Sequence, residues 1–344
     1  MASGPNENGV VADQEESVRA FARAWRNEVE RGLLAHPDTG PDEAVVAVIS
    51  DVHAVVAALG AVLHSARERG ATQVWCLGDV VGRGPSPGGC RRALRDLGPN
   101  LVTEWLVGNH EGMWLGLPES PRTGVRPDAL DVIDRHGRDL LDVTVGRVAL
   151  SDHAVECAPP ATARGGRSRL VYDRWTWKME AAAQPRHGGA TAFLVHGGAP
   201  TQSDSAVDAY TTDILSVHQL RNYATKRSED AGLGPPRIIL AGHTHILDAW
   251  SINGDHLIRQ PVEIGVETPI NYDCFYLNVG SSGGWPRGWS PPRPTYGLLR
   301  FGASAVSWAV IDVEADLEPE RELMRSLGYP HSVVSSLASQ GDGT

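Results

Sequence analysis

Five short polar segments contain the residues of this chain that are best suited to chemistry. They are Asp51-Val52-His53, Gly78-Asp79, Gly108-Asn109-His110-Glu111, His196-Gly197 and Gly242-His243-Thr244-His245. Each follows an apolar run of strand length, and a loop after such a run presents its polar side chains at the carboxyl end of the strand. Open α/β sheets bind their ligands there. Aspartate is a common turn residue, so one Gly-Asp pair would prove little, but five such segments predict one shared site.

Two of the segments carry paired candidate ligands. In Asp51-x-His53 and in His243-x-His245 the two side chains are two residues apart, so an extended backbone directs both to the same side. The remaining segments complete a set of two carboxylates, one carboxamide and four imidazoles, which consists of Asp51, Asp79, Asn109, His53, His196, His243 and His245.

This mixture of oxygen and nitrogen ligands favours transition-metal ions. It suits borderline divalent ions such as manganese, iron, cobalt, nickel or zinc, whereas magnesium alone would require more oxygen ligands. A single catalytic ion must keep an open position, so the set is too large for one ion. It suits two ions that share a bridge, and a carboxylate can bridge two ions whereas an imidazole cannot.

The segments between these motifs predict a layered α/β fold. Residues 44–50 and 73–77 have the pattern of strands, and residues 55–69 that of a helix, which together form a parallel βαβ unit with a right-handed crossover. A helix at 87–97 and a strand at 101–107 continue this unit. Further on, strands are predicted at 192–195 and 237–241, a helix at 213–227, and a second, largely antiparallel sheet from short strands at 249–252, 257–259, 274–279, 297–301 and 305–312.

The flanking regions divide the chain into three parts. Residues 1–43 are predicted to be an N-terminal extension with an amphipathic helix that packs on the sheet or on a neighbouring subunit, followed by a linker at 36–42. Residues 44–315 form the main domain, with a cap-like insert at about 112–190 that includes helices near 129–140 and 173–183 and a strand near 145–150. Residues 316–344 add a C-terminal helix and a flexible tail.

Composition excludes several classes of protein. The 344 residues are 41% hydrophobic and 21% charged, as in an ordinary soluble globular protein, and the net charge of −11 argues against a broad basic surface for nucleic acid. The 4 cysteines form no CxxC pair, which favours reduced thiols in the cytoplasm over disulfides or a thiolate zinc site. We find no secretory signal and no apolar run of bilayer length, so we expect a cytoplasmic protein without a membrane partner. The oligomeric state stays open.

The order of the polar segments resembles a known family. Asp-x-His, Gly-Asp, Gly-Asn-His, His and Gly-His-x-His follow one another as in the calcineurin-like metallophosphoesterases, and the resemblance extends over about residues 45–301. We therefore expect an α/β fold, specifically a four-layer α/β/β/α sandwich of two β-sheets flanked by helices, with the metal site at the carboxyl ends of the strands.

The resemblance also implies a role for each residue. It implies that two divalent or mixed-valence ions (Mn, Fe, Zn, Ni or Co) are held by seven ligands, the first ion by Asp51, His53 and His245, the second by Asn109, His196 and His243, and both by the bridging Asp79. A hydroxide between the ions would attack phosphorus in line. His110 would face the substrate and protonate the leaving oxygen, and Arg83 would clamp the phosphoryl group.

The motifs do not match a single branch of the family. Asp79-x-x-x-Arg83-Gly84 resembles the protein phosphatase branch, whereas the Gly-His-Thr-His segment departs from that branch. The Asn-Pro-Gly-Ser loop that is common in the bacterial phosphodiesterase branch is Asn278-Val279-Gly280-Ser281 here, and the glycine that often follows Asp-x-His is Ala54. None of these differences removes a ligand, but together they leave the choice between monoester and diester open.

We expect a phosphoesterase that hydrolyses the phosphomonoester of a small metabolite or nucleotide, because an insert of this length would tend to enclose the site. Alternatives are a phosphodiesterase or a dinucleotide polyphosphate hydrolase. A protein phosphatase is less favoured, and so is a catalytically silent protein-binding scaffold, since all the ligands and His110 are present. Trp175 and Trp177 could stack on a nucleobase, and Arg287 and Arg293 could bind a second anionic group.

Overall fold

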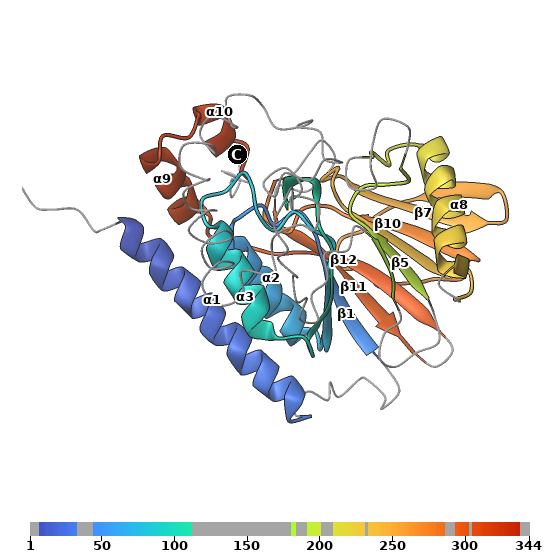
Figure 1. Cartoon of the computed structure of the whole chain (residues 1–344), viewed down its shortest axis with the longest axis horizontal. Coiled ribbons are helices and arrows are strands. Elements are labelled where there is room, and N and C mark those ends of the chain that lie inside the picture. Colours follow the sequence, from blue (N-terminus) through green and yellow to red (C-terminus); the bar gives the residue numbers. More distant parts are fainter. Residues whose placement is uncertain are drawn as a thin grey trace, which may run out of the picture.

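The protein is a layered α/β structure. The computed structural model describes residues 7–32, 44–111, 180–183, 191–200, 209–230, 233–285, 293–302 and 305–337. Two six-stranded β-sheets pack face to face, and helices cover their outer faces (Figure 1). The expected four-layer sandwich is therefore confirmed. In the described part of the chain, no helix has the length and apolar character needed to cross a bilayer.

The first sheet is built around the predicted βαβ unit. β1 (Ala44–Ile49) pairs in parallel with β2 (Gln73–Cys76), which pairs in parallel with β3 (Val102–Trp105). The connections are α2 (Val56–Glu68) and α3 (Pro87–Leu97). α3 begins at a proline, the usual signal for the start of a helix, and is followed by Gly98 at a positive φ (75°) that glycine adopts readily.

Three later strands extend this sheet on the other side of β1. β11 (Thr295–Phe301) pairs antiparallel with β1, β12 (Val306–Asp312) with β11, and the short β9 (Thr268–Pro269) with β12. The prediction that residues 297–312 belong to the second sheet is thus wrong. β1 is buried along its whole length, and such strands lack the polar alternation that would help to identify their neighbours.

The second sheet is mixed rather than largely antiparallel. Its strand order is β4-β5-β6-β10-β7-β8, in which β5, β6 and β10 are parallel and the other pairs are antiparallel. The strands are β4 (Glu180–Ala183), β5 (Ala192–Val195), β6 (Ile238–Ala241), β10 (Cys274–Val279), β7 (Leu247–Asn253) and β8 (His256–Gln260).

β4 corrects one local prediction. The helix predicted over 173–183 is wrong for residues 180–183, because the antiparallel pairing of Glu180–Ala183 with β5 overrides the helix propensity of alanine.

The C-terminal region forms two helices rather than one, α9 (Glu318–Ser326) and α10 (His331–Val334). Outside the described residues lie the linker at 36–42, the elements predicted at 129–140 and 145–150, and Trp175, Trp177 and Arg287.

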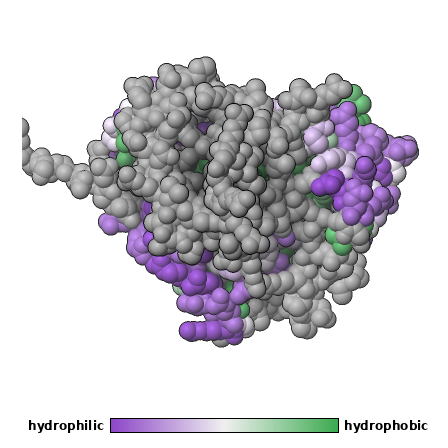
Figure 2. All heavy atoms as spheres, in the orientation of Figure 1, coloured by the Kyte–Doolittle hydropathy of each residue, from purple (hydrophilic) through white to green (hydrophobic). Residues whose placement is uncertain are grey.

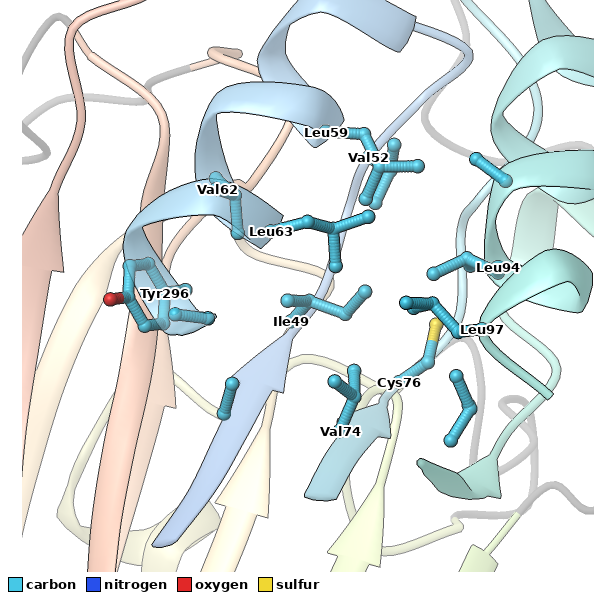
Figure 3. Packing of buried hydrophobic residues seen from close by; sticks show 14 of the residues in the cluster. Ile49, Val52, Leu59, Val62, Leu63, Val74, Cys76, Leu94, Leu97 and Tyr296 are labelled. Atoms are coloured by element: carbon cyan, nitrogen blue, oxygen red, sulfur yellow. The ribbon is translucent and has the colours of Figure 1, made fainter. Parts of the chain in front are cut away.

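The side chains of β1 divide between two cores because successive residues of a strand point to opposite faces. Val45, Ala47 and Ile49 face α2 and α3, where Ile49 packs with Leu59, Leu63, Leu97 and others (Figure 3). Ala44, Val46 and Val48 face the second sheet and join the core between the two sheets. Both faces of the strand are thus buried, which fixes the position of the loop that follows it.

Two long helices lie on opposite sides of the sandwich, one directly on the second sheet and one outside α2 and α3. α8 (Ile214–Asp230) packs Val217, Leu220 and Ala224 on the outer face of the second sheet. α1 (Glu7–Glu30) places Ala22 and Trp25 in the core beneath α2 and α3, so the predicted amphipathic helix covers helices rather than the sheet. The outward faces of both helices are hydrophilic (Figure 2).

Candidate metal centre

The loops after the strands bring all seven predicted ligands together. The Asp51-x-His53 pair follows β1, and the His243-x-His245 pair follows β6. Asp79 follows β2, Asn109 follows β3 and His196 follows β5. Each ligand is buried, and the most exposed of them, His243, has an exposed fraction of 6%. The residues therefore come from both sheets and meet at one edge of the sandwich, as expected for the carboxyl ends of parallel strands.

The first predicted set forms a tight cluster of donor atoms. Asp51 Oδ1 lies 3.2 Å from Nε2 of His245 and 3.7 Å from Nε2 of His53. The two imidazole nitrogens are 2.9 Å apart. The other carboxylate oxygen, Asp51 Oδ2, accepts a hydrogen bond from Ser50 Oγ (2.7 Å) and one from the backbone N–H of His243 (2.8 Å). These two bonds leave Oδ1 directed into the cluster.

The second predicted set surrounds the side-chain oxygen of Asn109. Asn109 Oδ1 lies 3.1 Å from Nε2 of His196 and 2.9 Å from Nδ1 of His243. The carboxamide thus turns its oxygen rather than its nitrogen toward the two imidazoles. Three donor atoms of different residues converge there, in the same way as in the first set.

Asp79 connects the two clusters through one oxygen. Its Oδ1 accepts a hydrogen bond from the backbone N–H of His110 at 2.8 Å. Its Oδ2 lies 3.4 Å from Nε2 of His196 in the second set and 3.7 Å from Nε2 of His53 in the first. A single carboxylate oxygen is therefore placed between the two sets, where a bridging ligand has to be.

The arrangement fits metal ions. Ligand bonds of about 2.1 Å place neighbouring donor atoms of one ion roughly 3.0–3.4 Å apart, close to the separations in both clusters. Three groups of His and Asp donor atoms each lie within 4.8 Å of one another, among them Asp51 with His53 and His245, and Asp79 with His196 and His243. Asp51 Oδ1, which points into the first cluster, is a buried atom for which the described residues provide no hydrogen-bond partner. Metal coordination would account for such an atom on a ligand.

Backbone carbonyl groups orient three of the imidazoles. The Nδ1 atoms of His53, His196 and His245 lie 3.3, 2.9 and 2.7 Å from the carbonyl oxygens of Val81, Leu77 and Trp285. A carbonyl oxygen only accepts, so each Nδ1 carries a hydrogen, and Nε2 is the nitrogen through which each ring would bind a metal ion. The outer contacts thus fix the tautomer that a metal site needs.

Backbone strain is concentrated at the same residues. Asp51, His53, Ala54, Asp79, Arg83, His243 and His245 are all the non-glycine residues with positive φ in the described part, at 49–64°. Each such conformation costs roughly 1–2 kcal/mol, so surrounding bonds must hold it. The N–H of His53 donates to the carbonyl oxygen of Asp79 at 2.8 Å, for example. Ala54 (φ 60°) likewise has a left-handed conformation that glycine adopts without steric cost.

Nearby glycines make room for these side chains. A Cβ atom on Gly108 would lie 2.0 Å from Asp79 Oδ1, and one on Gly242 would lie 2.6 Å from Asp51 Oδ2. Gly82 has φ of 86°, and a Cβ there would lie 2.1 Å from Nδ1 of His110. Any larger residue at these positions would displace a predicted ligand or the predicted proton donor.

Glu111 is a supporting residue whose role the sequence did not predict. Its buried carboxylate accepts hydrogen bonds from the backbone N–H groups of Asp79, Val80, Val81 and Gly108 at 2.7–3.1 Å. Burial and the Asp79 charge raise the pKa of Glu111 to about 7, against the effect of these donors. Glu111 joins the loops after β2 and β3.

The loop after β10 supports the site from the other side. Asn278 donates through Nδ2 to the carbonyl oxygen of Gly242 (2.6 Å), and Ser281 donates through Oγ to the carbonyl oxygen of Asp51 (2.8 Å). The Ser281 hydroxyl also accepts from the backbone N–H of Trp285, whose carbonyl group orients His245. The Asn-Val-Gly-Ser segment is therefore structural, and its valine does not disturb these contacts.

Asp79 and His196 form a buried ion pair. Burial alone would raise the pKa of Asp79, but the imidazoles of His196 and His110 outweigh it and hold that pKa well below its ordinary value. Burial would likewise lower the pKa of His196, but the Asp79 carboxylate raises it to about 9. A metal ion at Nε2 would have to displace this proton.

The imidazoles of His53, His243 and His110 are held neutral. Burial lowers the pKa of His53 well below its ordinary value, and the Arg83 charge adds to this effect. Burial also lowers the pKa of His243 to about 3 and that of His110 to about 4. Neutral imidazole is the form that binds a metal ion. His53 and His243 could therefore bind one without first losing a proton.

The two predicted substrate-facing residues lie at the edge of the first cluster. The ring centroid of His110 is 4.6 Å from that of His53, and His110 Nε2 lies 4.0 Å from Asp79 Oδ2. The guanidinium carbon of Arg83 lies 5.9 Å from the ring centroid of Trp285. Arg293, in contrast, pairs with Asp312 (3.4 Å) and Glu314 (3.0 Å) on the surface.

Comparison with known proteins places the chain in a family. A sequence model described as calcineurin-like phosphoesterase matches residues 44–247, which is more than half of the chain. The uncharacterized protein MJ0912 from Methanocaldococcus jannaschii is 37% identical over 95 residues, or 28% of this chain. The matched segment is 33% of the length of that relative.

Two crystal structures share the fold. A metallophosphoesterase from Sphaerobacter thermophilus aligns over 86% of this chain and 98% of its own with 22% identity and a TM-score of 0.54. Hypothetical protein PH1004 from Pyrococcus horikoshii OT3 aligns over 87% and 99% with 15% identity and a TM-score of 0.56. At these identities the structures show the fold alone. The family match, the fold and the clustered donor atoms together show that this chain belongs to the calcineurin-like phosphoesterase family of metal-dependent phosphoesterases.

Proposed function

We propose that the protein hydrolyses phosphomonoesters of small metabolites or nucleotides and that it uses two divalent or mixed-valence metal ions. One observation carries this proposal. Two clusters of donor atoms, one at Asp51 and one at Asn109, lie on either side of Asp79 Oδ2. When bound, two such ions lower the pKa of bound water and offset the charge that develops on the phosphoryl oxygens.

Seven side chains of the two clusters would hold these ions. The first would be held by Asp51, His53 and His245, the second by Asn109, His196 and His243, and Asp79 would contribute to both. The backbone N–H of His110 keeps Asp79 Oδ1 in place, so Oδ2 keeps its position between the clusters. The carbonyl oxygen of Trp285 does the same for His245.

His110 is the proposed proton donor to the leaving oxygen. Burial lowers its pKa to about 4, against the opposing charge of Asp79. A bound phosphoryl dianion adds negative charge beside the ring and therefore favours its protonated form. The Nδ1 atom of His110 is buried without a hydrogen-bond partner among the described residues, so no carbonyl group fixes its tautomer. This distinguishes His110 from His53, His196 and His245.

Arg83 supports the preference for monoesters. A monoester dianion carries one more charge than a diester, and a guanidinium group binds such an anion through a planar pair of donors. The charge of Arg83 contributes to the lowered pKa values of both His53 and His110, so it lies within electrostatic reach of the centre. The ring of Trp285 supports the guanidinium group from one side.

Hydrolysis of matched model esters tests the proposal. The full chain is depleted of metal, reconstituted in turn with Mn, Fe, Zn, Ni or Co, and assayed with p-nitrophenyl phosphate and bis(p-nitrophenyl) phosphate. We expect metal-dependent turnover with a higher kcat/KM for the monoester. A clear preference for the diester would support the phosphodiesterase alternative instead, and failure to turn over either ester with any metal would contradict the proposal.

A further inference from the structure

Tyr210 is an exposed aromatic residue beside the candidate metal centre. Its ring centroid lies 4.3 Å from that of His243, and the two ring planes are inclined by 49°. The exposed fraction of Tyr210 is 44%, whereas that of His243, the most accessible predicted ligand, is 6%. The centre is therefore most accessible at His243, and Tyr210 forms the rim at that point.

The backbone that follows Tyr210 is fixed by hydrogen bonds. The Thr211 hydroxyl donates to the carbonyl oxygen of Gly197, the residue after the predicted ligand His196, at 3.3 Å. Gly198 permits this close approach, because a Cβ there would lie 2.5 Å from Thr211 Oγ1. Asp213 then accepts from the backbone N–H of Ser216 at 2.8 Å and caps the start of α8. The ring is thus held beside the centre by the segment that carries it.

The two sides of the centre differ in chemical character. On the side of His53 lies Trp285, whose ring centroid is 6.4 Å from that of His53 and 5.9 Å from the guanidinium carbon of the cation Arg83. On the side of His243 lies the uncharged ring of Tyr210. An ester with an anionic phosphoryl group and a flat organic group matches this division, because the charge can face Arg83 while the organic group contacts Tyr210.

We propose that Tyr210 forms a subsite for the organic part of the substrate and that this subsite favours phosphate esters of aromatic or heteroaromatic groups, nucleobases included. The inference rests on the proposed phosphoesterase function and narrows its substrate class. Stacking on an aromatic side chain suits flat groups of many kinds, because each has a π-face. Aliphatic phosphate esters gain no comparable contact at this position.

Binding of two phosphonates that the enzyme cannot hydrolyse tests the subsite. Phenylphosphonate and methylphosphonate carry the same anionic group and differ in the organic group. Calorimetric titration of the metal-loaded full chain measures the Kd of each. We expect wild type to bind phenylphosphonate more tightly, and Tyr210→Ala to raise the Kd of phenylphosphonate roughly five- to tenfold while that of methylphosphonate changes less than about twofold.

Two further variants complete the test. Tyr210→Phe keeps the ring and should keep the preference for phenylphosphonate. Leu215→Ala removes another exposed apolar side chain from the same region, on the first turn of α8, and should bind both ligands like wild type.

Other outcomes would overturn the subsite. If Tyr210→Ala weakened both phosphonates equally, the tyrosine would support His243 and not the organic group. If it weakened neither, or if wild type bound both alike, the subsite would be wrong while the phosphoesterase function stood. If wild type bound neither ligand, the proposed function would fail together with the subsite.

Discussion

The carboxylate of Glu111 accepts a hydrogen bond from the backbone N–H of Asp79, with Oε2 2.8 Å from the nitrogen. The same oxygen accepts from Gly108 at 2.8 Å, and Oε1 accepts from Val80 at 2.7 Å. One side chain therefore fixes the left-handed loop that presents the proposed bridging ligand. The hydrogen bonds that Glu111 accepts thus offset the backbone strain at Asp79 (φ 52°), and substitution of Glu111 tests this contribution.

Glu111→Gln should destabilise the fold and weaken metal binding together. The glutamine carbonyl can replace one carboxylate oxygen, but its NH₂ group would oppose N–H donors at the other. We expect a loss of about 2–4 kcal/mol in the free energy of unfolding, because bonds to a charged acceptor are lost. Denaturant unfolding and metal analysis measure both effects. A variant with wild-type stability and metal content would show that Glu111 does not hold the loop.

Asp79→Asn should remove at least one ion and abolish activity. The asparagine oxygen can still accept from the N–H of His110, but its NH₂ group would replace Oδ2 between the two clusters. We expect metal affinity to fall by at least about 100-fold, more than loss of an outer contact usually causes. Metal analysis after dialysis is the measurement. Two tightly held ions and normal turnover would refute the bridging assignment.

His110→Ala should keep both ions and lose most turnover. Loss of a proton donor typically lowers the rate by about 10²–10⁴-fold, and the loss should be smallest for substrates with good leaving groups. A series of aryl phosphates with leaving groups of different pKa measures this dependence at constant metal content. An equal loss for every substrate would argue against proton donation by His110.

The clustering of the seven predicted ligands could be foreseen because it depends on local order in the chain. Each predicted ligand follows an apolar run, and parallel strands end at one edge whichever neighbours they have. Strand partners could not be predicted in the same way. β11 pairs with β1 although the two strands lie near opposite ends of the sequence. A strand such as β1, which is buried on both faces, has no polar alternation that would identify its partner.

Supporting contacts escaped prediction for a related reason. Glu111 acts through backbone N–H groups of two loops, and Tyr210 contacts His243 across the fold. A carboxylate after Gly-Asn-His or a tyrosine before a helix has no spacing that encodes such contacts. They depend on the tertiary arrangement of loops, which the strand order decides.

Arg83→Gln should reduce hydrolysis of monoesters more than that of diesters. The variant removes the charge but keeps a polar side chain of similar length. We expect kcat/KM for p-nitrophenyl phosphate to fall about 10–100-fold, the effect of losing a hydrogen bond to a charged group, and that for the bis-ester to fall less. Arg293→Gln is the control, because Arg293 pairs with Asp312 and Glu314 on the surface. If kcat/KM fell equally for both esters, Arg83 would not contribute to the preference for monoesters.

Glu320 should make stability depend on pH independently of the metal centre. This buried residue of α9 accepts the backbone N–H of Ala57 at 2.7 Å, and its Oε2 has no hydrogen-bond partner among the described residues. Burial raises the pKa of Glu320 from 4.5 to about 7, while Ala57 and, more weakly, Arg321 act in the opposite direction and Asp316 adds to the rise. The folded state therefore binds a proton between these pH values that the unfolded state has lost.

The sign of the effect follows from this difference in bound protons. The contribution of Glu320 is fully present below about pH 4.5 and is lost as the pH rises through about 7, which lowers the free energy of unfolding by up to about 3 kcal/mol. Glu320→Gln keeps an acceptor for Ala57 and cannot ionise, so its stability relative to wild type should increase from pH 5 to pH 8. Glu322→Gln, on the exposed face of the same helix, should follow wild type. Thermal unfolding across this range measures the difference, and parallel curves for Glu320→Gln and wild type would show that Glu320 does not titrate on unfolding.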